Sequence, residues 1–178
     1  MERERQAVSC CACVSAESQV PKPLKIPRSV LVIAFTPARE VLLIERADFA
    51  GFWQSVTGSQ EEGVSWEATA NRELMEETGF DAAPYGGVID LQYRNVYCIY
   101  PRWRHRYPLG VTHNEERCFG VCLPTAFTPR LAPREHVAYE WMPLAAAVVK
   151  ATSWSNVAAL RHLQLQFSPI MNTRKRLP

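Results

Sequence analysis

One stretch constrains this chain more than any other. It runs from Gly58 to Phe80 and reads GSQEEGVSWEATANRELMEETGF. Its Glu73, Glu76 and Glu77 are spaced so that, on a helix, their three carboxylates share one face. Carboxylates about 5 Å apart repel by about 3 kcal/mol per pair at an effective dielectric near 20. Because such an oxygen cluster suits Mg²⁺ or Mn²⁺, the stretch predicts a metal-binding helix, with a solvated acidic helix face as the alternative.

The predicted helix has recognisable ends. Ser65 can cap its start, Glu67 is favourable in the first turn, and Gly79 can adopt the left-handed conformation that terminates a helix. Before it, Gly58 and Gly63 bracket a loop whose backbone N–H groups can approach a phosphate. The whole stretch therefore predicts a phosphate-binding loop followed by an acidic helix.

Taken together, these residues resemble the Nudix box, with Gly58 followed at the family's spacing by Arg72-Glu73-Leu74-Met75-Glu76-Glu77-Thr78-Gly79-Phe80. The resemblance implies a hydrolase that depends on a divalent cation. One position departs, because the family has a glutamate where this chain has Val64. That glutamate usually braces the box arginine, so we expect Arg72 to lean on another carboxylate, with three candidates: Glu61, Glu62 and Glu67.

Strand patterns occur on both sides of the box. Apolar, β-branched and aromatic runs predict strands at 29–35, 41–45, 88–94, 96–100, 118–123 and 136–142. Helical spacing of apolar residues predicts a second helix over 154–167, and residues 101–114 read as a long basic and aromatic loop. Strands on both sides of one helix, with another at the end, predict an α/β fold, an α/β/α sandwich around a mixed sheet, which is the Nudix fold.

Length and composition limit the possible domain organisation, partners and cellular compartment. With 178 residues the chain suits one domain at 24–168, with a flexible extension at 1–23 and a loose tail at 169–178. A net charge of +2 argues against a nucleic-acid partner, and no apolar run reaches the ~20 residues that span a bilayer. The six cysteines lack zinc-ligand spacing and favour free, buried thiols in a reduced cytoplasm. Oligomeric state is not readable from the sequence.

Segments outside the box resemble one branch of the family, which hydrolyses dihydroneopterin triphosphate in bacterial folate synthesis. They are FWQSVTGS (52–59), RHRYPLGVTHN (104–114), REHVAYEW (134–141) and TSWSN (152–156). The resemblance implies that Glu135 completes the metal set with Glu73 and Glu77, and that Tyr97, Cys98, Ile99 and Tyr100 line a pterin pocket. It also implies substrate contacts for Lys25, Arg46, Thr57 and Ser153.

The expected reaction is metal-dependent hydrolysis that releases pyrophosphate and dihydroneopterin monophosphate. Mg²⁺ is the expected cofactor, with Mn²⁺ possible, and Glu73, Glu76 and Glu77 are the expected catalytic residues. Two alternatives stay open. One is a broader nucleoside triphosphate diphosphatase acting on dATP, because a purine presents edges similar to those of a pterin. The other is a non-hydrolytic binding module, which Val64 motivates.

Overall fold

The computed structural model describes residues 24–167. The sequence-based predictions for the extension at 1–23 and the tail at 169–178 lie outside the described residues. No helix within 24–167 is long and apolar enough to cross a membrane.

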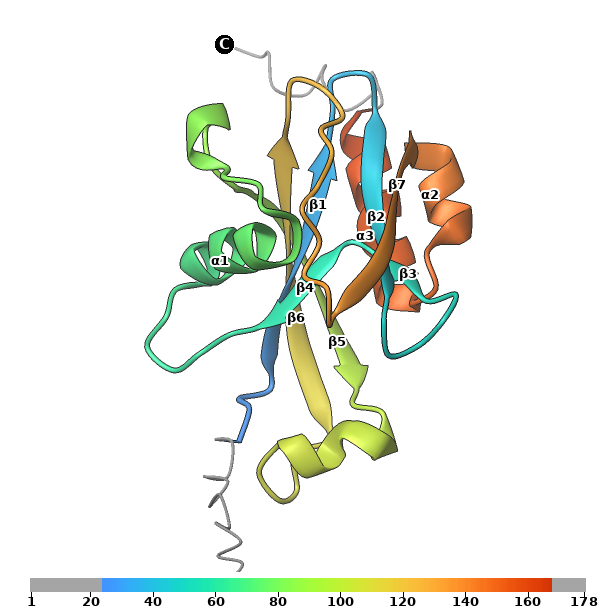
Figure 1. The fold of residues 1–178 in the computed structure, drawn as a ribbon. Coiled ribbons are helices and arrows are strands. Elements are labelled where there is room, and N and C mark those ends of the chain that lie inside the picture. The colour runs from blue at the N-terminus through green and yellow to red at the C-terminus, as the bar shows by residue number, and fades with distance from the viewer. Residues whose placement is uncertain (1–23, 168–178) are drawn as a thin grey trace, which may run out of the picture.

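A mixed seven-stranded sheet forms the centre of the molecule (Figure 1). Its main path runs β3-β2-β1-β6-β5, with β4 paired to β1 and β7 paired to β2. Strands β1 and β6 are parallel and the other pairs are antiparallel. The strands are β1 (Arg28–Phe35), β2 (Glu40–Arg46), β3 (Trp53–Gln54), β4 (Val56–Ser59), β5 (Ile89–Cys98), β6 (His113–Cys122) and β7 (His136–Pro143).

Helices cover both faces of this sheet, which confirms the α/β/α sandwich (Figure 1). Helix α1 (Trp66–Thr78) packs on one face, and α2 (Leu144–Lys150) and α3 (Trp154–Gln166) pack on the other. Two short 3₁₀ turns, η1 (Ala83–Tyr85) and η2 (Pro101–Arg106), lie in the connections that flank β5.

Strand β1 explains why the chain needs helices on both faces. Its side chains alternate between two apolar clusters, with Leu31 on the α2/α3 side and Val30 on the α1 side. Leu74 of α1 and Leu160 of α3 are both fully buried against these faces. Burial of a side chain of this size contributes roughly 1.5–3 kcal/mol, so the continuous apolar run at 29–35 anchors the fold from both sides.

Four details differ from the sequence-based expectations. Residues 88–100, expected as two strands, contain one strand with a bulge, because Gln92 adopts a positive φ of 54° and shifts the register. Strand β6 begins at His113, inside the expected loop, and α2 was missed because its short alanine-rich run lacks a long apolar period. Cys98 is exposed, not buried.

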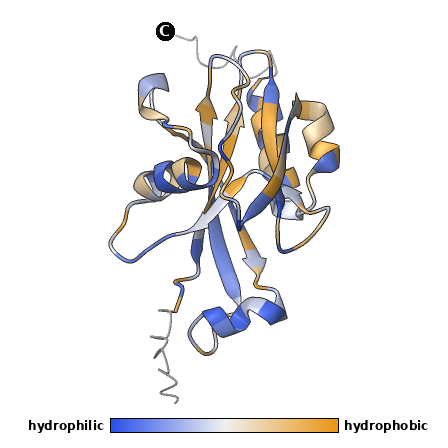
Figure 2. Cartoon of the chain, in the orientation of Figure 1, coloured by the Kyte–Doolittle hydropathy of each residue, from blue (hydrophilic) through white to orange (hydrophobic). Residues whose placement is uncertain are grey.

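The sheet changes character along its length. Figure 2 shows the strands as hydrophobic beside the helices and hydrophilic toward the end that carries η2. On β6 the change falls between the buried apolar Phe119 and the polar segment that begins at His113. The polar end of the sheet is therefore where a site for a charged ligand can form.

Candidate active site

Helix α1 presents the box glutamates from one face. Its N-cap is Ser65, whose hydroxyl accepts a backbone hydrogen bond of 3.1 Å from the first turn, and its C-cap Gly79 is left-handed with φ of 73°, both as predicted. Glu73 and Glu77 are buried, whereas the side chain of Glu76 is 57% exposed. The helix turns two carboxylates inward and leaves the third in solvent.

Glu73 fits only because residue 58 is a glycine. A Cβ atom on Gly58 would lie 1.7 Å from Glu73 Cδ, so any other side chain there would displace the carboxylate. Burial raises the pKa of Glu73 to about 7, against the opposing effect of Arg72, whose Nη2 atom lies 2.9 Å from Glu73 Oε1. Because burial makes the ionised form of Glu73 unfavourable, a bound cation would stabilise that form strongly.

Arg72 is braced differently from the expectation. Its Nη2 atom donates to the Ser59 carbonyl at 3.0 Å, and its Nη1 atom donates to Glu76 at 3.0 Å. Of the expected substitutes, Glu61 lies at the outer limit of an ion pair, 3.9 Å away. Among the described residues Arg72 makes no ion pair with the remaining candidates, Glu62 and Glu67. The helix itself supplies both carboxylates: Glu76 lies one turn after Arg72 on the same face, and Glu73 is its neighbour in sequence.

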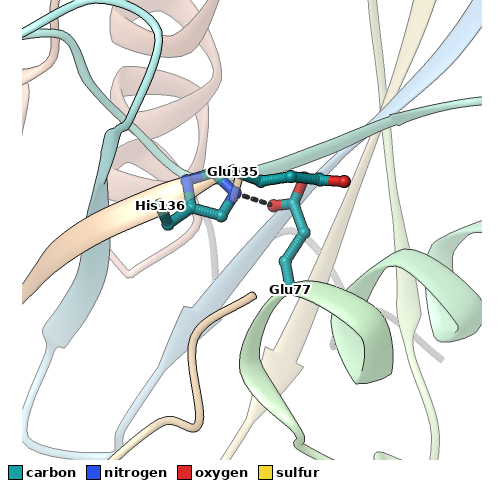
Figure 3. A group of neighbouring side chains, drawn as sticks. All are labelled: Glu77, Glu135 and His136. Carbon is teal, nitrogen blue, oxygen red and sulfur yellow. Dashed lines mark ion pairs between the residues drawn. The ribbon is translucent and has the colours of Figure 1, made fainter. Parts of the chain in front are cut away.

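A second acidic group joins α1 to the start of β7. Glu77, Glu135 and His136 each offer a ligand atom, and these atoms lie within 4.8 Å of one another (Figure 3). His136 Nε2 lies 3.2 Å from Glu77 Oε2, and the same oxygen accepts a 3.3 Å hydrogen bond from Thr57 N. Burial raises the pKa of Glu77, and the contact with His136 opposes this. Strand pairing of β2 with β7 brings these distant residues to α1.

The donors of this group fit a divalent cation. Two carboxylates supply hard oxygen ligands, and desolvation favours a positive charge beside both buried glutamates of α1. Both ring nitrogens of His136 are buried without a well-aligned hydrogen bond within 24–167. A histidine nitrogen in this state can serve as a metal ligand. Glu73 lies outside the 4.8 Å group, and its role as a third ligand stays a prediction.

Basic side chains lie beside the carboxylates. Lys25 Nζ donates to Ser59 Oγ at 2.7 Å, and burial together with the nearby Arg106 lowers the pKa of this lysine. Arg46 forms a two-pronged contact with Asp48, with both N···O distances at 2.7 Å. These positive groups can meet the negative charge of a polyphosphate.

The strand segment expected to line a heterocycle pocket has mixed burial. Ile99 is buried, Tyr97 is partly buried, and Cys98 and Tyr100 are exposed. The Tyr97 ring meets Trp154 edge to face, with centroids 6.5 Å apart. Ring faces of this kind form one wall of a slot for a flat ligand.

All of the sequence-nominated residues line one cleft of about 1040 Å³. The cleft brings together the α1 carboxylates with Glu135, basic side chains and the aromatic β5 segment. Thr57 and Ser153 line it as well. Residues from elements and connections that are far apart in sequence thus form one site. Their individual functional roles stay predictions.

Several cleft residues were not singled out from the sequence. A single histidine such as His136 is by itself no evidence of a site, and the long loop predicted function without indicating that Trp103 and Arg106 reach the cleft. The sequence indicated Glu115 and Glu116 only as reserve carboxylates near the site and did not distinguish between these two adjacent glutamates. Strand alternation was the available signal, since it separates Glu116 from Glu115 once the strand is known to start at His113.

Comparisons with known proteins agree with this geometry. The profile of the NUDIX domain matches residues 25–163. Dihydroneopterin triphosphate diphosphatase of Escherichia coli strain K12 is 40% identical over 141 residues, which cover 78% of this chain and 93% of that protein. The enzyme of the same name from Haemophilus influenzae is 33% identical over 136 residues, covering 75% of this chain and 85% of its own.

Solved structures give the same result. The structure of the E. coli dihydroneopterin triphosphate pyrophosphohydrolase superposes with a TM-score of 0.74 at 37% identity, covering 82% of this chain and 99% of that chain. A NUDIX hydrolase structure from Listeria monocytogenes, at 24% identity and a TM-score of 0.68, supports the fold.

Proposed function

The chain belongs to the NUDIX domain family, and from this premise we propose that it hydrolyses dihydroneopterin triphosphate to dihydroneopterin monophosphate and pyrophosphate, a step of folate biosynthesis. We assign the reaction to a domain at residues 24–168. Two relatives that match over at least three quarters of this chain carry this activity in their names.

The observation that carries the proposal is that one cleft combines three kinds of side chain. Carboxylates, basic groups and aromatic side chains all line it. A pterin triphosphate has parts that match them: metal-binding phosphates, further phosphate charge, and a flat heterocycle. This correspondence supports a single substrate that spans the whole cleft.

In this proposal Glu73, Glu77 and Glu135 hold Mg²⁺, with Mn²⁺ as a substitute. When bound, the cation neutralises phosphate charge and lowers the pKa of an attacking water. His136 orients the Glu77 carboxylate through their 3.2 Å contact. The side chains of Glu76 and Glu77 are the candidates for accepting the proton of that water.

The phosphates need cationic partners as well. Lys25 already donates a hydrogen bond to Ser59 of β4, and Arg46 can exchange its Asp48 partner for a phosphate oxygen. Thr57 and Ser153 also line the cleft and supply polar contacts. Tyr97, Cys98, Ile99 and Tyr100 line the heterocycle position.

The deciding experiment compares pyrophosphate release from dihydroneopterin triphosphate and from dATP, each with and without Mg²⁺. We expect the pterin substrate to give the higher kcat/KM and the reaction to stop in excess EDTA. A higher kcat/KM for dATP would establish the broader nucleotide diphosphatase instead. Binding of either ligand without any turnover in Mg²⁺ would establish the non-hydrolytic module that Val64 raises as an alternative.

A further inference from the structure

Glu116 occupies an unusual position on the central strand β6. It pairs with Ser29 of β1 on one side and with Asn95 of β5 on the other. Its side chain lies on the same face as Cys118, which packs toward α3, and it lines the cleft beside the first turn of that helix. The residue therefore lines the cleft although it lies far in sequence from the box.

The Glu116 carboxylate is buried and has no cationic partner. The residue is 4% exposed, and no ion pair involving it exists within residues 24–167. Asn95 Nδ2 donates to Glu116 Oε1 at 3.2 Å, and Ser155 provides a second hydrogen bond. The adjacent Glu115 contrasts with it, because that carboxylate lies 3.6 Å from two arginines.

The Glu116 carboxylate has hydrogen-bond acceptor capacity that the protein does not use. Burial raises the pKa of the Glu116 carboxyl, so its ionised form gains from further donors. An ionised carboxylate accepts about four hydrogen bonds, and the two protein donors leave about half of that capacity for a ligand. Burial without a cation makes a ligand with N–H donors favourable, since an unsatisfied buried charge is costly. A simple structural role would explain the two protein contacts but gives no reason for a carboxylate to face the cleft.

The surroundings of Glu116 suit a planar ring. Tyr97 and Trp154 line the same cleft, their rings meeting edge to face, and Trp154 is 57% exposed. The Tyr97 hydroxyl is held by hydrogen bonds with Ser29 and Asn114. The wall that it forms is therefore fixed beside the carboxylate.

We propose that Glu116 determines heterocycle specificity by accepting hydrogen bonds from an amino group and an adjacent ring N–H, the edge that dihydropterin and guanine share. This inference rests on the proposed function in that the phosphates bind at the α1 carboxylates and leave the heterocycle to Glu116. A carboxylate matches two adjacent donors. Adenine instead presents a ring acceptor beside its amino group, which would face a carboxylate oxygen unfavourably.

The primary test is a fluorescence titration of neopterin, which carries the donor edge but no phosphate. Glu116→Gln places an amide donor against one ligand donor, so we expect its neopterin Kd to rise at least tenfold. The matched control is Glu115→Gln, the same change one residue away on the opposite face, with an expected change below twofold. Pyrophosphate binding in Mg²⁺ should change less than twofold in both variants.

Two outcomes would overturn the proposal. One is neopterin binding to Glu116→Gln as tightly as to the native protein. The other is an equal loss of neopterin and pyrophosphate binding, which would indicate general damage to the site. Because the titration needs no turnover, a protein that releases no pyrophosphate but binds neopterin through Glu116 would refute the proposed hydrolysis and leave this inference standing.

A second measurement uses only the native protein and holds even if Glu116→Gln does not fold. Lumazine has a carbonyl where pterin has its amino group, so we expect pterin to bind at least tenfold more tightly; equal binding would contradict the proposal. Competition by dGTP and dATP then tests the guanine edge. We expect dGTP to displace neopterin at a lower concentration than dATP, and the reverse order would count against recognition by Glu116.

Discussion

Removing the charge of Glu73 should stabilise the metal-free protein. Burial raises the pKa of this carboxyl from an ordinary 4.5 to about 7 in the folded state. The folded protein then binds more protons than the unfolded chain between these values, so stability falls as pH rises from 4.5 to 7 and stays lower above that range. At about 1.4 kcal/mol per pH unit, the ionised carboxylate costs about 3 kcal/mol at pH 8.

Glu73→Gln keeps the shape of the protonated acid and removes this cost. We expect its metal-free form at pH 8 to melt roughly 6–12 °C above the native protein, since 1 kcal/mol shifts Tm by about 2–4 °C in a domain of this size. At pH 5 the difference should shrink below about 1 kcal/mol. Thermal unfolding in EDTA at both pH values measures it, with Glu62→Gln as a control that removes an exposed charge from the preceding loop.

Added Mg²⁺ should reverse the order at pH 8, because only the native protein gains the full stabilisation by the bound ion. The reasoning is refuted if Glu73→Gln is less stable than the native protein in EDTA at pH 8. It is also refuted if the Tm difference is the same at pH 5 and pH 8, since the cause would then not be ionisation of Glu73.

Three further substitutions test the site. Glu77→Gln should lower turnover at least ~10²-fold with the fold intact by circular dichroism, because an amide is a poor ligand for a hard cation; near-native activity in Mg²⁺ would refute the box assignment. Gly58→Ala should lower turnover to a similar extent, because its Cβ would overlap the Glu73 carboxylate; an unchanged rate would contradict that geometry. Val64→Glu should change the rate less than about tenfold, ~1.4 kcal/mol on the barrier, because Arg72 is already braced; strong rescue of an inactive native chain would show otherwise.

The sequence alone determined the features that depend on local spacing. Helix α1 and both of its caps follow from residues 65–79, since a helix is closed by contacts within four residues. The sandwich follows from the uninterrupted apolar run of β1, which has to be covered on both faces. Resemblance to the family added the distant Glu135, which the structure brings near Glu77.

Tertiary structure decided what depends on strand pairing and burial. The contact between Glu77 and His136 exists because β7 pairs with β2, and no local pattern indicates that pairing. The brace of Arg72 was expected from Glu61, Glu62 or Glu67, and only the packed site shows that Glu73 and Glu76 provide it. Glu116 was missed for the same physical reason: adjacent strand residues point to opposite faces, and only the packed sheet shows that one glutamate meets two arginines while its neighbour is enclosed beside the cleft.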